Sequence, residues 1–192
     1  MVVPTLQLSQ DPDADALLST DPLALLLGML LDQQISMEKA FRGPRDLRDR
    51  LGRDLDAGDI ASRANLGQLF AQQPAIHRFP GSMAGRVQAL CQVLVDDYDG
   101  RAEAVWEDAR SGTELLRRMK QLPGFGDQKA RIFVALLGKQ YDVKPRGWRK
   151  AAGDYGDVGA LRSIADVVDP DSLLKVRAYK QSVKAAAKAA KG

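Results

Sequence analysis

The chain has 192 residues, a net charge of +3, 45% hydrophobic residues and a single cysteine, which is an ordinary composition for a globular protein. One cysteine excludes an internal disulfide and an iron–sulfur cluster held by four cysteines. The N-terminus has no basic region followed by an apolar core, and the apolar run 23–31 is shorter than the roughly 20 residues that span a bilayer, so we expect neither a secretory signal nor a membrane partner.

Charged residues are distributed unevenly along the chain. From Lys144 to the C-terminus, eleven Lys and Arg residues stand against five Asp residues, whereas acids outnumber bases in residues 1–60. An excess of cations in one part of a chain is typical of a protein that meets a polyanion through that part.

Helical patterns dominate the first half of the chain, and no strong alternating strand pattern is present. Asp21-Pro22 is an N-cap followed by proline at the first helical position. The helix that it begins is apolar almost all round as far as Leu31, which predicts a place at the centre of the fold. Further helices are predicted over residues 37–51, with an interruption at Gly43-Pro44, and over residues 60–72.

The second half of the chain also predicts helices. Phe79-Pro80-Gly81-Ser82 indicates a turn and an N-cap, and the apolar stripe of the helix that follows includes Cys91, which we interpret as a core residue. Helices are predicted near 102–108, up to Gln121, from about 130, near 158–168 and over 171–184, with a loop at 143–148. The Lys/Ala-rich tail 184–192 is expected to fray when free, either as a solubilising end or as an electrostatic arm along DNA phosphates.

The segment Leu122-Pro123-Gly124-Phe125-Gly126 separates two of these helices and has the outline of a helix-hairpin-helix. Pro123 ends the first helix, and the two glycines remove the Cβ atom where the backbone turns and approaches another group closely. The second helix begins with free N–H groups and the positive end of its dipole, which suits a phosphate. This hairpin therefore predicts binding of a nucleic-acid backbone without regard to base sequence.

A second polar motif, Asp32-Gln33-Gln34-Ile35-Ser36, follows the most apolar helix directly. Adjacent glutamines are costly to bury unless their amides find partners, so the motif indicates a polar site or a DNA-facing turn rather than core. Arg86 begins a helix that leads toward the hairpin.

Together these motifs resemble the helix-hairpin-helix (HhH-GPD) DNA glycosylase superfamily, most closely its alkylpurine-DNA glycosylase-like branch without an iron–sulfur cluster, over roughly Leu23 to Gly156. The resemblance implies an all-α, two-lobed fold with the active site in the cleft between the lobes. It implies a helical domain over 1–183, with a central lobe at about 21–120, the hairpin at 112–140 and a second lobe from the N-terminal segment plus about 145–183. Residues 184–192 would form a flexible tail.

The resemblance also implies which residues contact DNA. In that family the glutamine turn inserts one side chain, by position Gln34, into the space left by a flipped nucleotide. The hairpin amides bind phosphate, often with Na⁺ or K⁺ on main-chain carbonyls, here those of Gln121, Leu122 and Phe125. The implied DNA-binding residues are Gln33, Gln34, Ser36, Arg86, Leu122, Gly124, Phe125, Gly126, Gln128, Lys129, Arg146 and Trp148.

Two positions depart from the family's catalytic pattern. The lysine nucleophile of its bifunctional members falls at Gln128, and Lys129 is about 100° of helix away, so a Schiff-base mechanism there is not expected. The catalytic aspartate falls at Arg146, whose cation would repel the positive charge of an oxocarbenium-like sugar. Asp142 and Asp154 are the candidate replacements, and a solvated loop or cap carboxylate is the other role for each.

Two aromatic residues and the only histidine have alternative roles. Trp148 and Tyr155 are candidates to stack on an extruded base, and Trp148 is equally a candidate for core packing between the lobes. We interpret His77 as a structural or surface residue, because the sequence offers no metal-ligand partner for it.

Three hypotheses for function follow. The first, which we favour, is a monofunctional DNA glycosylase acting in base-excision repair, with its carboxylate in a non-standard position; the Gln33-Gln34 turn favours this retained base flipping. The second is a catalytically silent DNA-binding protein that recognises lesions or branched DNA, which Arg146 favours. The third is a helical interaction module without a DNA role. The first two imply a cytoplasmic monomer (nucleoid-associated if bacterial) that binds double-stranded DNA and needs no cofactor beyond the cation at the hairpin.

Overall fold

The computed structural model describes residues 3–192, which form ten α-helices and three short 3₁₀ helices. The only strand-like pairing within these residues is a single bridge between Ser111 and Arg146, so the predicted all-α class is confirmed. In chain order the elements are α1 (Pro12–Thr20), α2 (Pro22–Leu31), α3 (Met37–Leu51), α4 (Ala57–Ser62), α5 (Leu66–Ala71), α6 (Pro80–Tyr98), η1 (Ala102–Val105), α7 (Gly112–Gln121), α8 (Asp127–Gln140), α9 (Trp148–Ala152), η2 (Gly153–Gly156), η3 (Ile164–Asp166) and α10 (Pro170–Ala189).

Three helices begin with the same local signal, an aspartate N-cap followed by proline at the first helical position. The pairs are Asp11-Pro12, Asp21-Pro22 and Asp169-Pro170. Each carboxylate accepts hydrogen bonds from backbone N–H groups of its first turn, as in the 2.7 Å bond from Ser172 N to Asp169 Oδ1. Such a cap stabilises a helix by about 0.5–2 kcal/mol. The predicted start of α2 is confirmed, and the same signal marks α1, a helix that was not among the predicted elements.

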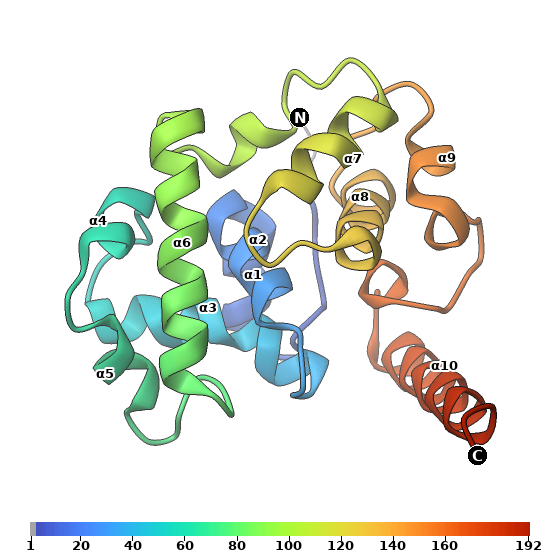
Figure 1. Ribbon diagram of the computed structural model, residues 1–192, viewed down its shortest axis with the longest axis horizontal. Helices are drawn as coiled ribbons and strands as arrows, with labels where there is room; N and C mark the ends of the chain where they lie inside the picture. Colours follow the sequence, from blue (N-terminus) through green and yellow to red (C-terminus); the bar gives the residue numbers. More distant parts are fainter. Residues whose placement is uncertain (1–2) are drawn as a thin grey trace.

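Helix α2 lies at the centre of the molecule, as its apolar surface predicts, and every residue from Leu23 to Leu31 is buried. It packs mainly on α3, while α4 and α5 cover α6 to one side, at the left of Figure 1. On the other side α7, α9, η2 and η3 all pack on α8. Cys91 is fully buried on α6, and burial raises the pKa of its thiol to about 12, which confirms its interpretation as core.

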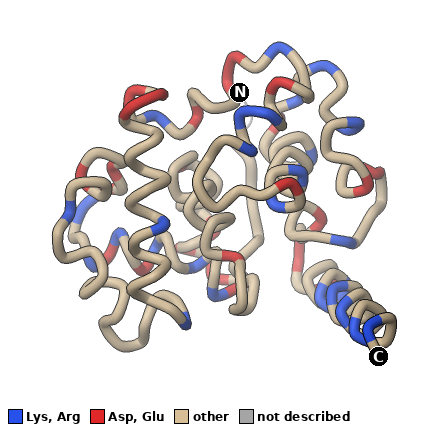
Figure 2. The backbone as a smooth tube through the Cα atoms, viewed as in Figure 1, with Lys and Arg blue, Asp and Glu red and all other residues tan. Residues whose placement is uncertain are grey.

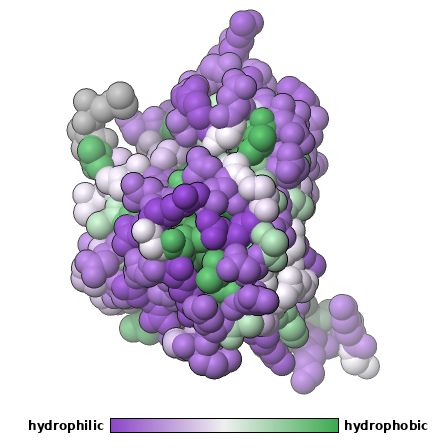
Figure 3. Space-filling view, turned by 90° about the vertical axis from the view of Figure 1, so that its left-hand side faces the viewer, coloured by the Kyte–Doolittle hydropathy of each residue, from purple (hydrophilic) through white to green (hydrophobic). Residues whose placement is uncertain are grey.

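No single helix among the described residues is long and apolar enough to cross a membrane. Helices α1 and α2 reach the length and composition only as a pair, which is bent by 117°. The face formed by α4, α5 and α6 is mostly hydrophilic, with small apolar areas in its middle (Figure 3).

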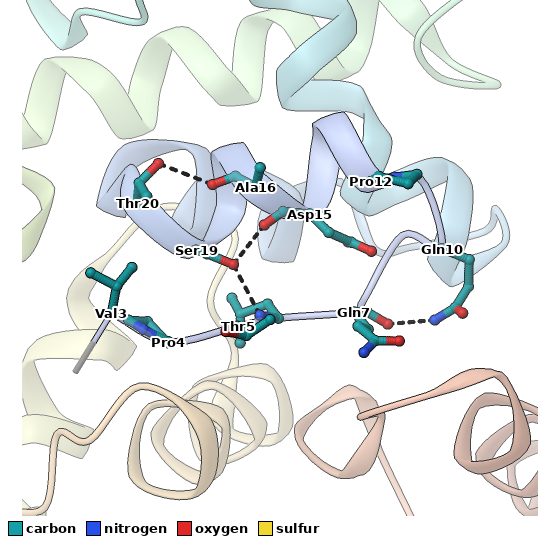
Figure 4. A pocket seen from close by; sticks show the side chains of 11 residues that line it. Val3, Pro4, Thr5, Gln7, Gln10, Pro12, Asp15, Ala16, Ser19 and Thr20 are labelled. Atoms are coloured by element: carbon teal, nitrogen blue, oxygen red, sulfur yellow. Dashed lines mark hydrogen bonds between the residues drawn. The ribbon is translucent and has the colours of Figure 1, made fainter.

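The segment 3–9 runs along α1 (Figure 4). Its backbone is held by buried polar side chains of that helix: Leu6 N donates to Ser19 Oγ at 2.9 Å, and Ser9 N donates to Asp15 Oδ1 at 2.8 Å. A pocket of about 480 Å³ lies between the segment and α1. Helix α1 itself packs on α2 and α3.

The predicted interruption of the third helix at Gly43-Pro44 is wrong. Helix α3 has the predicted ends, Met37 and Leu51, and continues through Pro44. Gly43 lies so close to α2 that a Cβ there would be 2.6 Å from Cδ1 of Leu31. The packing against α2 outweighs the hydrogen bond that the proline removes.

The single helix predicted over residues 60–72 is also wrong, because α4 ends at Ser62 and α5 begins at Leu66. Arg63 between them is extended, and its carbonyl accepts a 2.8 Å hydrogen bond from the side-chain amide of Gln88 on α6. A tertiary contact therefore stabilises this break, which local patterns do not reveal.

Other boundaries differ as well. Helix α6 begins at Pro80 rather than after an N-cap at Ser82, and residues 158–168 form only the short η3 instead of a full helix. The Lys/Ala-rich segment from Lys184 continues α10 as far as Ala189, as the high helix propensity of alanine favours. Helix α10 projects from the molecule at the lower right of Figure 1.

Candidate nucleic-acid interface

The hairpin between α7 and α8 is a tight turn anchored by buried side chains. Phe125 N donates to Leu122 O at 3.1 Å, and Gly124 adopts a φ of +82°, which glycine tolerates best. A Cβ at Gly124 would also lie 2.4 Å from Cδ1 of Leu30, so the turn is pressed against the end of α2. The side chains of Leu122 and Phe125 are buried, which leaves their backbone as the only part able to meet a ligand.

Helix α8 begins without a side-chain cap. Its N-cap, Gly126, is exposed, and a Cβ there would meet nothing within 4 Å. No described residue accepts a hydrogen bond from the N–H groups of residues 127–129, so they remain available, the arrangement that binds phosphate. Asp127 stands at the first helical position, and its ion pairs with Lys120 at 3.0 Å and Arg131 at 2.8 Å hold the pKa of its carboxyl below the usual range.

The glutamine turn between α2 and α3 contains one satisfied amide and one exposed one. Gln33 donates from Nε2 to Leu30 O at 3.1 Å and accepts at Oε1 from Arg86 at 2.8 Å. Gln34 is exposed and has a φ of +57°, an uncommon conformation for a non-glycine residue. Ser36 caps α3 by accepting from Lys39 N. Arg86 thus binds the turn from α6, and Gln34 is the side chain that remains available outside.

His77 fixes the same turn from beneath. The ring is buried, its Nε2 donates to the backbone oxygen of Gln33 at 3.0 Å, and its Nδ1 accepts from Phe79 N at 3.0 Å. Because a backbone N–H can only donate, these contacts require the neutral ring with its proton on Nε2. Burial lowers the pKa of His77 and favours that neutral form. His77 therefore has the structural one of the two roles considered for it, and its partner lies 44 residues away in the sequence, which local patterns do not reveal.

The hairpin and the glutamine turn lie side by side at Leu30. Gly124 approaches the Leu30 side chain, and Lys129 Nζ donates to the Leu30 carbonyl oxygen at 3.0 Å. Lys129 is thus directed toward the end of α2, and burial lowers the pKa of its ammonium group to about 8.

A cavity of about 310 Å³ opens beside this junction, between the N-terminal part of α8, the segments η2 and η3, and α10. On one wall Gln128 Nε2 donates to Tyr155 Oη at 2.9 Å. Asp32 forms part of the lining with only 10% of its side chain exposed, and Lys180 Nζ lies 4.0 Å from its Oδ2. Burial raises the pKa of Asp32, while Lys180 and Lys129 oppose that effect. The lining residues are Asp32, Gln128, Ile132, Tyr155, Arg162, Ser163, Ile164, Tyr179, Lys180, Val183 and Lys184.

The two carboxylates proposed as replacements for the catalytic aspartate lie elsewhere. The Asp142 side chain is 84% exposed and pairs with Lys144 at 2.5 Å. Asp154 is 90% exposed and lies 3.9 Å from Arg162, at a shallow pocket next to the cavity. Both are solvated carboxylates, the second of the two roles considered for them.

Arg146 and Trp148 follow α8 on the side of α7. The Arg146 side chain is exposed, and its backbone oxygen accepts from Gly112 N at 2.8 Å. The Trp148 ring is buried against Gly138, where a Cβ would lie 2.4 Å from it. The structure therefore gives Trp148 the core role, and its ring is not free to stack on a base. Tyr155, the other aromatic candidate, lines the cavity.

Basic residues recur along α10 (Figure 2). They are Lys175, Arg177, Lys180, Lys184 and Lys188. Arg177 forms an ion pair with Glu38 of α3, and Lys180 reaches the cavity, so the first half of α10 lies against the glutamine turn and the second half extends beyond it.

Within residues 3–192, no group of three or more His, Cys, Asp or Glu side chains is arranged to hold a metal ion. Comparisons with family models, curated proteins and solved structures gave no match.

Proposed function

We propose that this protein is a monofunctional DNA glycosylase that binds damaged or distorted duplex DNA and cleaves the N-glycosidic bond of a flipped base. The proposal includes a two-lobed, helix-hairpin-helix glycosylase-like fold, which the sequence motifs favour. The observation that supports it best is the convergence of three features at the end of α2. The hairpin turn packs on Leu30, Gln33 and Gln34 follow directly, and Asp32 borders a cavity large enough for a small ligand.

Each feature supplies one step of base extrusion. The uncapped first turn of α8 binds a backbone phosphate and fixes the duplex. Gln34, exposed beside it, fills the space of the displaced nucleotide, while Gln33, His77 and Arg86 hold the turn rigid. The cavity then receives the base, whose unstacking costs a few kcal/mol, least for a damaged or mismatched pair.

Unpaired main-chain oxygens at the hairpin support the proposal of a monovalent cation there. Among the described residues none donates a hydrogen bond to the backbone oxygens of Gln121 and Phe125, and the oxygen of Leu122 accepts only one. Such oxygens are suitable ligands for Na⁺ or K⁺, which would reinforce the positive potential for a phosphate.

The second candidate function, a silent DNA-binding protein, is favoured by a different observation. Arg146, Asp142 and Asp154 are all exposed, so no carboxylate in the segment that follows α8 faces the cavity. A protein that kept the hairpin and the turn without an active carboxylate would bind lesions or branched DNA and leave them intact.

Gly126→Val tests the interface. The substitution adds a side chain where the phosphate would approach, without a clash inside the protein, so duplex affinity should fall at least about tenfold, the loss of one charge-assisted hydrogen bond. Gly67→Val in α5, where a Cβ also meets nothing within 4 Å, is the matched control. Equal affinity of both variants and the unchanged protein, measured by fluorescence anisotropy, would remove the hairpin from the proposal.

A panel of duplexes with uracil, hypoxanthine, alkylated bases, abasic sites and junctions then separates the two functions. Strand scission after alkali reports excision, and anisotropy reports binding. Excision of at least one lesion supports the glycosylase, whereas selective binding without excision across the panel supports the silent protein.

A further inference from the structure

Asp32 differs from the other largely buried carboxylates of the described chain because it accepts no hydrogen bond from the protein. Asp15 accepts from the backbone and hydroxyl of Ser9, and Asp166 pairs with Lys139 at 2.6 Å. No described residue donates a hydrogen bond to the Asp32 carboxylate, and its nearest ionic partner is Lys180 at 4.0 Å. The Asp32 side chain is 10% exposed and lines the cavity, so its carboxylate oxygens are open to the cavity and available to a ligand there.

Asp32 is also the only acidic residue in the lining of the cavity. It stands at the end of α2, directly before the glutamine turn, and lines the same cavity as the Gln128–Tyr155 pair. A nucleotide extruded past Gln34 would enter the cavity with its sugar near Asp32 and its base directed inward. Burial raises the pKa of Asp32, and the nearby Lys180 and Lys129 oppose that effect.

We propose that the cavity receives the flipped nucleotide and that Asp32 is the catalytic carboxylate facing its sugar. This inference rests on the proposed glycosylase function and names the residue that replaces the aspartate missing at Arg146. It also differs from the two candidates that the sequence offered, Asp142 and Asp154.

The reaction consumes one water molecule. The bond between C1′ and the base nitrogen breaks, and its electron pair leaves with the base, which takes up a proton from solvent. The Asp32 carboxylate stabilises the positive charge that develops on the sugar ring. Water then adds to C1′ and gives up a proton, leaving a free base and an abasic site.

Asp32→Asn is the test, because it removes the charge and keeps the shape. Excision in single-turnover experiments on the lesion that the wild type excises best should fall by roughly a hundredfold or more, with affinity for the same duplex within about threefold. Asp97→Asn, an exposed carboxylate on α6, is the matched control and should retain full excision. Thermal unfolding of each variant checks the fold. Asp32→Glu keeps the charge and should retain part of the wild-type excision rate, so it tests the carboxylate even if Asp32→Asn is poorly folded.

The outcomes separate the inference from the function on which it rests. Wild-type excision that persists in Asp32→Asn overturns the role of Asp32 and leaves the glycosylase intact, and loss of excision in Asp142→Asn or Asp154→Asn would then identify the carboxylate. A wild type that binds lesions and excises none overturns both. Loss of excision with retained binding in Asp32→Asn, and partial recovery in Asp32→Glu, supports the inference.

Discussion

At the scale of single residues, the candidate site depends on polar groups that are satisfied by the protein and on two that are left free. Gln33 and His77 use their hydrogen-bonding groups on each other and on Arg86, Leu30 and Phe79. Gln34 and Asp32, on either side of Gln33, have no such partners among the described residues. The satisfied residues hold the turn, and the free ones are directed to solvent and to the cavity.

The buried imidazole predicts a dependence of stability on pH. Because the pKa of His77 is lowered below its ordinary value of 6.5, the fold favours the neutral ring. That contribution is complete above about pH 6.5 and is lost as the pH falls through the lowered pKa, because protonated Nδ1 can no longer accept from Phe79 N. The melting temperature should therefore fall between pH 6.5 and 5 by several degrees.

His77→Gln is the control for this prediction, because glutamine does not titrate in that range. The variant should be less stable at pH 7.5 and lose less of its remaining stability on acidification. Asp21 and Asp32 have raised pKa values, so their protonation favours the fold as the pH falls and has the opposite sign. Parallel curves for the two proteins between pH 6.5 and 5 would show that His77 does not titrate as described.

At the scale of elements, short sequence patterns predicted those helix ends that depend only on neighbouring residues. The Asp21-Pro22 pair gave the start of α2, and the same pair at Asp11-Pro12 was available for α1. The break between α4 and α5 was not predictable, because Gln88 of α6 stabilises it. The hairpin turn was predicted from its residues, whereas the approach of His77 and Lys129 to the α2 end, and the exposure of Asp32 to a cavity, depend on tertiary packing.

Helix α10 gives a prediction about salt dependence. Lys184 lines the cavity, and the helix beyond it carries Lys188 away from the body of the protein, followed by Lys191. If this end of the helix lies along DNA, each lost phosphate contact should reduce the slope of log affinity against log salt by about 0.9. Deletion of residues 184–192 should therefore reduce the slope by roughly one to three.

Replacement of Lys188 and Lys191 by Gln is the matched control, because it removes charge and keeps the length of the helix and the cavity wall. Affinities measured from 50 to 200 mM salt should show a smaller reduction of the slope than the deletion. A slope equal to that of the full chain in both variants would leave the end of α10 without a role in DNA binding.

At the scale of the whole molecule, the uneven distribution of charge along the sequence determines the charge of the cavity lining. The basic C-terminal part contributes Arg162, Lys180 and Lys184 to the lining, while the more acidic first part contributes Asp32 alone. The cavity thus combines one carboxylate near the turn with several cationic and neutral donors, among them Gln128 and the Tyr155 hydroxyl. Whichever lesion enters must match that chemistry.

The excess of cationic side chains in the cavity lining predicts the class of lesion that the cavity accepts. An N-alkylated purine nucleotide carries a positive charge on its base, which three cationic side chains would repel. Uracil and hypoxanthine are neutral and present carbonyl oxygens, which accept hydrogen bonds from lysine, arginine and amide donors. We therefore expect excision of deaminated bases to exceed that of 3-methyladenine or 7-methylguanine by at least about tenfold in kcat/KM, although the sequence resembles an alkylpurine branch.

Lys180→Met provides the sharper comparison, since it removes one cation from the cavity and keeps the length of the side chain. The substitution should lower the rate of excision of uracil and hypoxanthine and bring it closer to the rate for alkylated purines. Lys175→Met, at an exposed position outside the cavity, should change the rates for neither class of lesion. Preference of the wild type for cationic purines would contradict the assignment of this cavity to the base. In that case the lysines would face phosphate, and the Lys180→Met variant would lose affinity for every duplex alike, because phosphate contacts carry no information about the base.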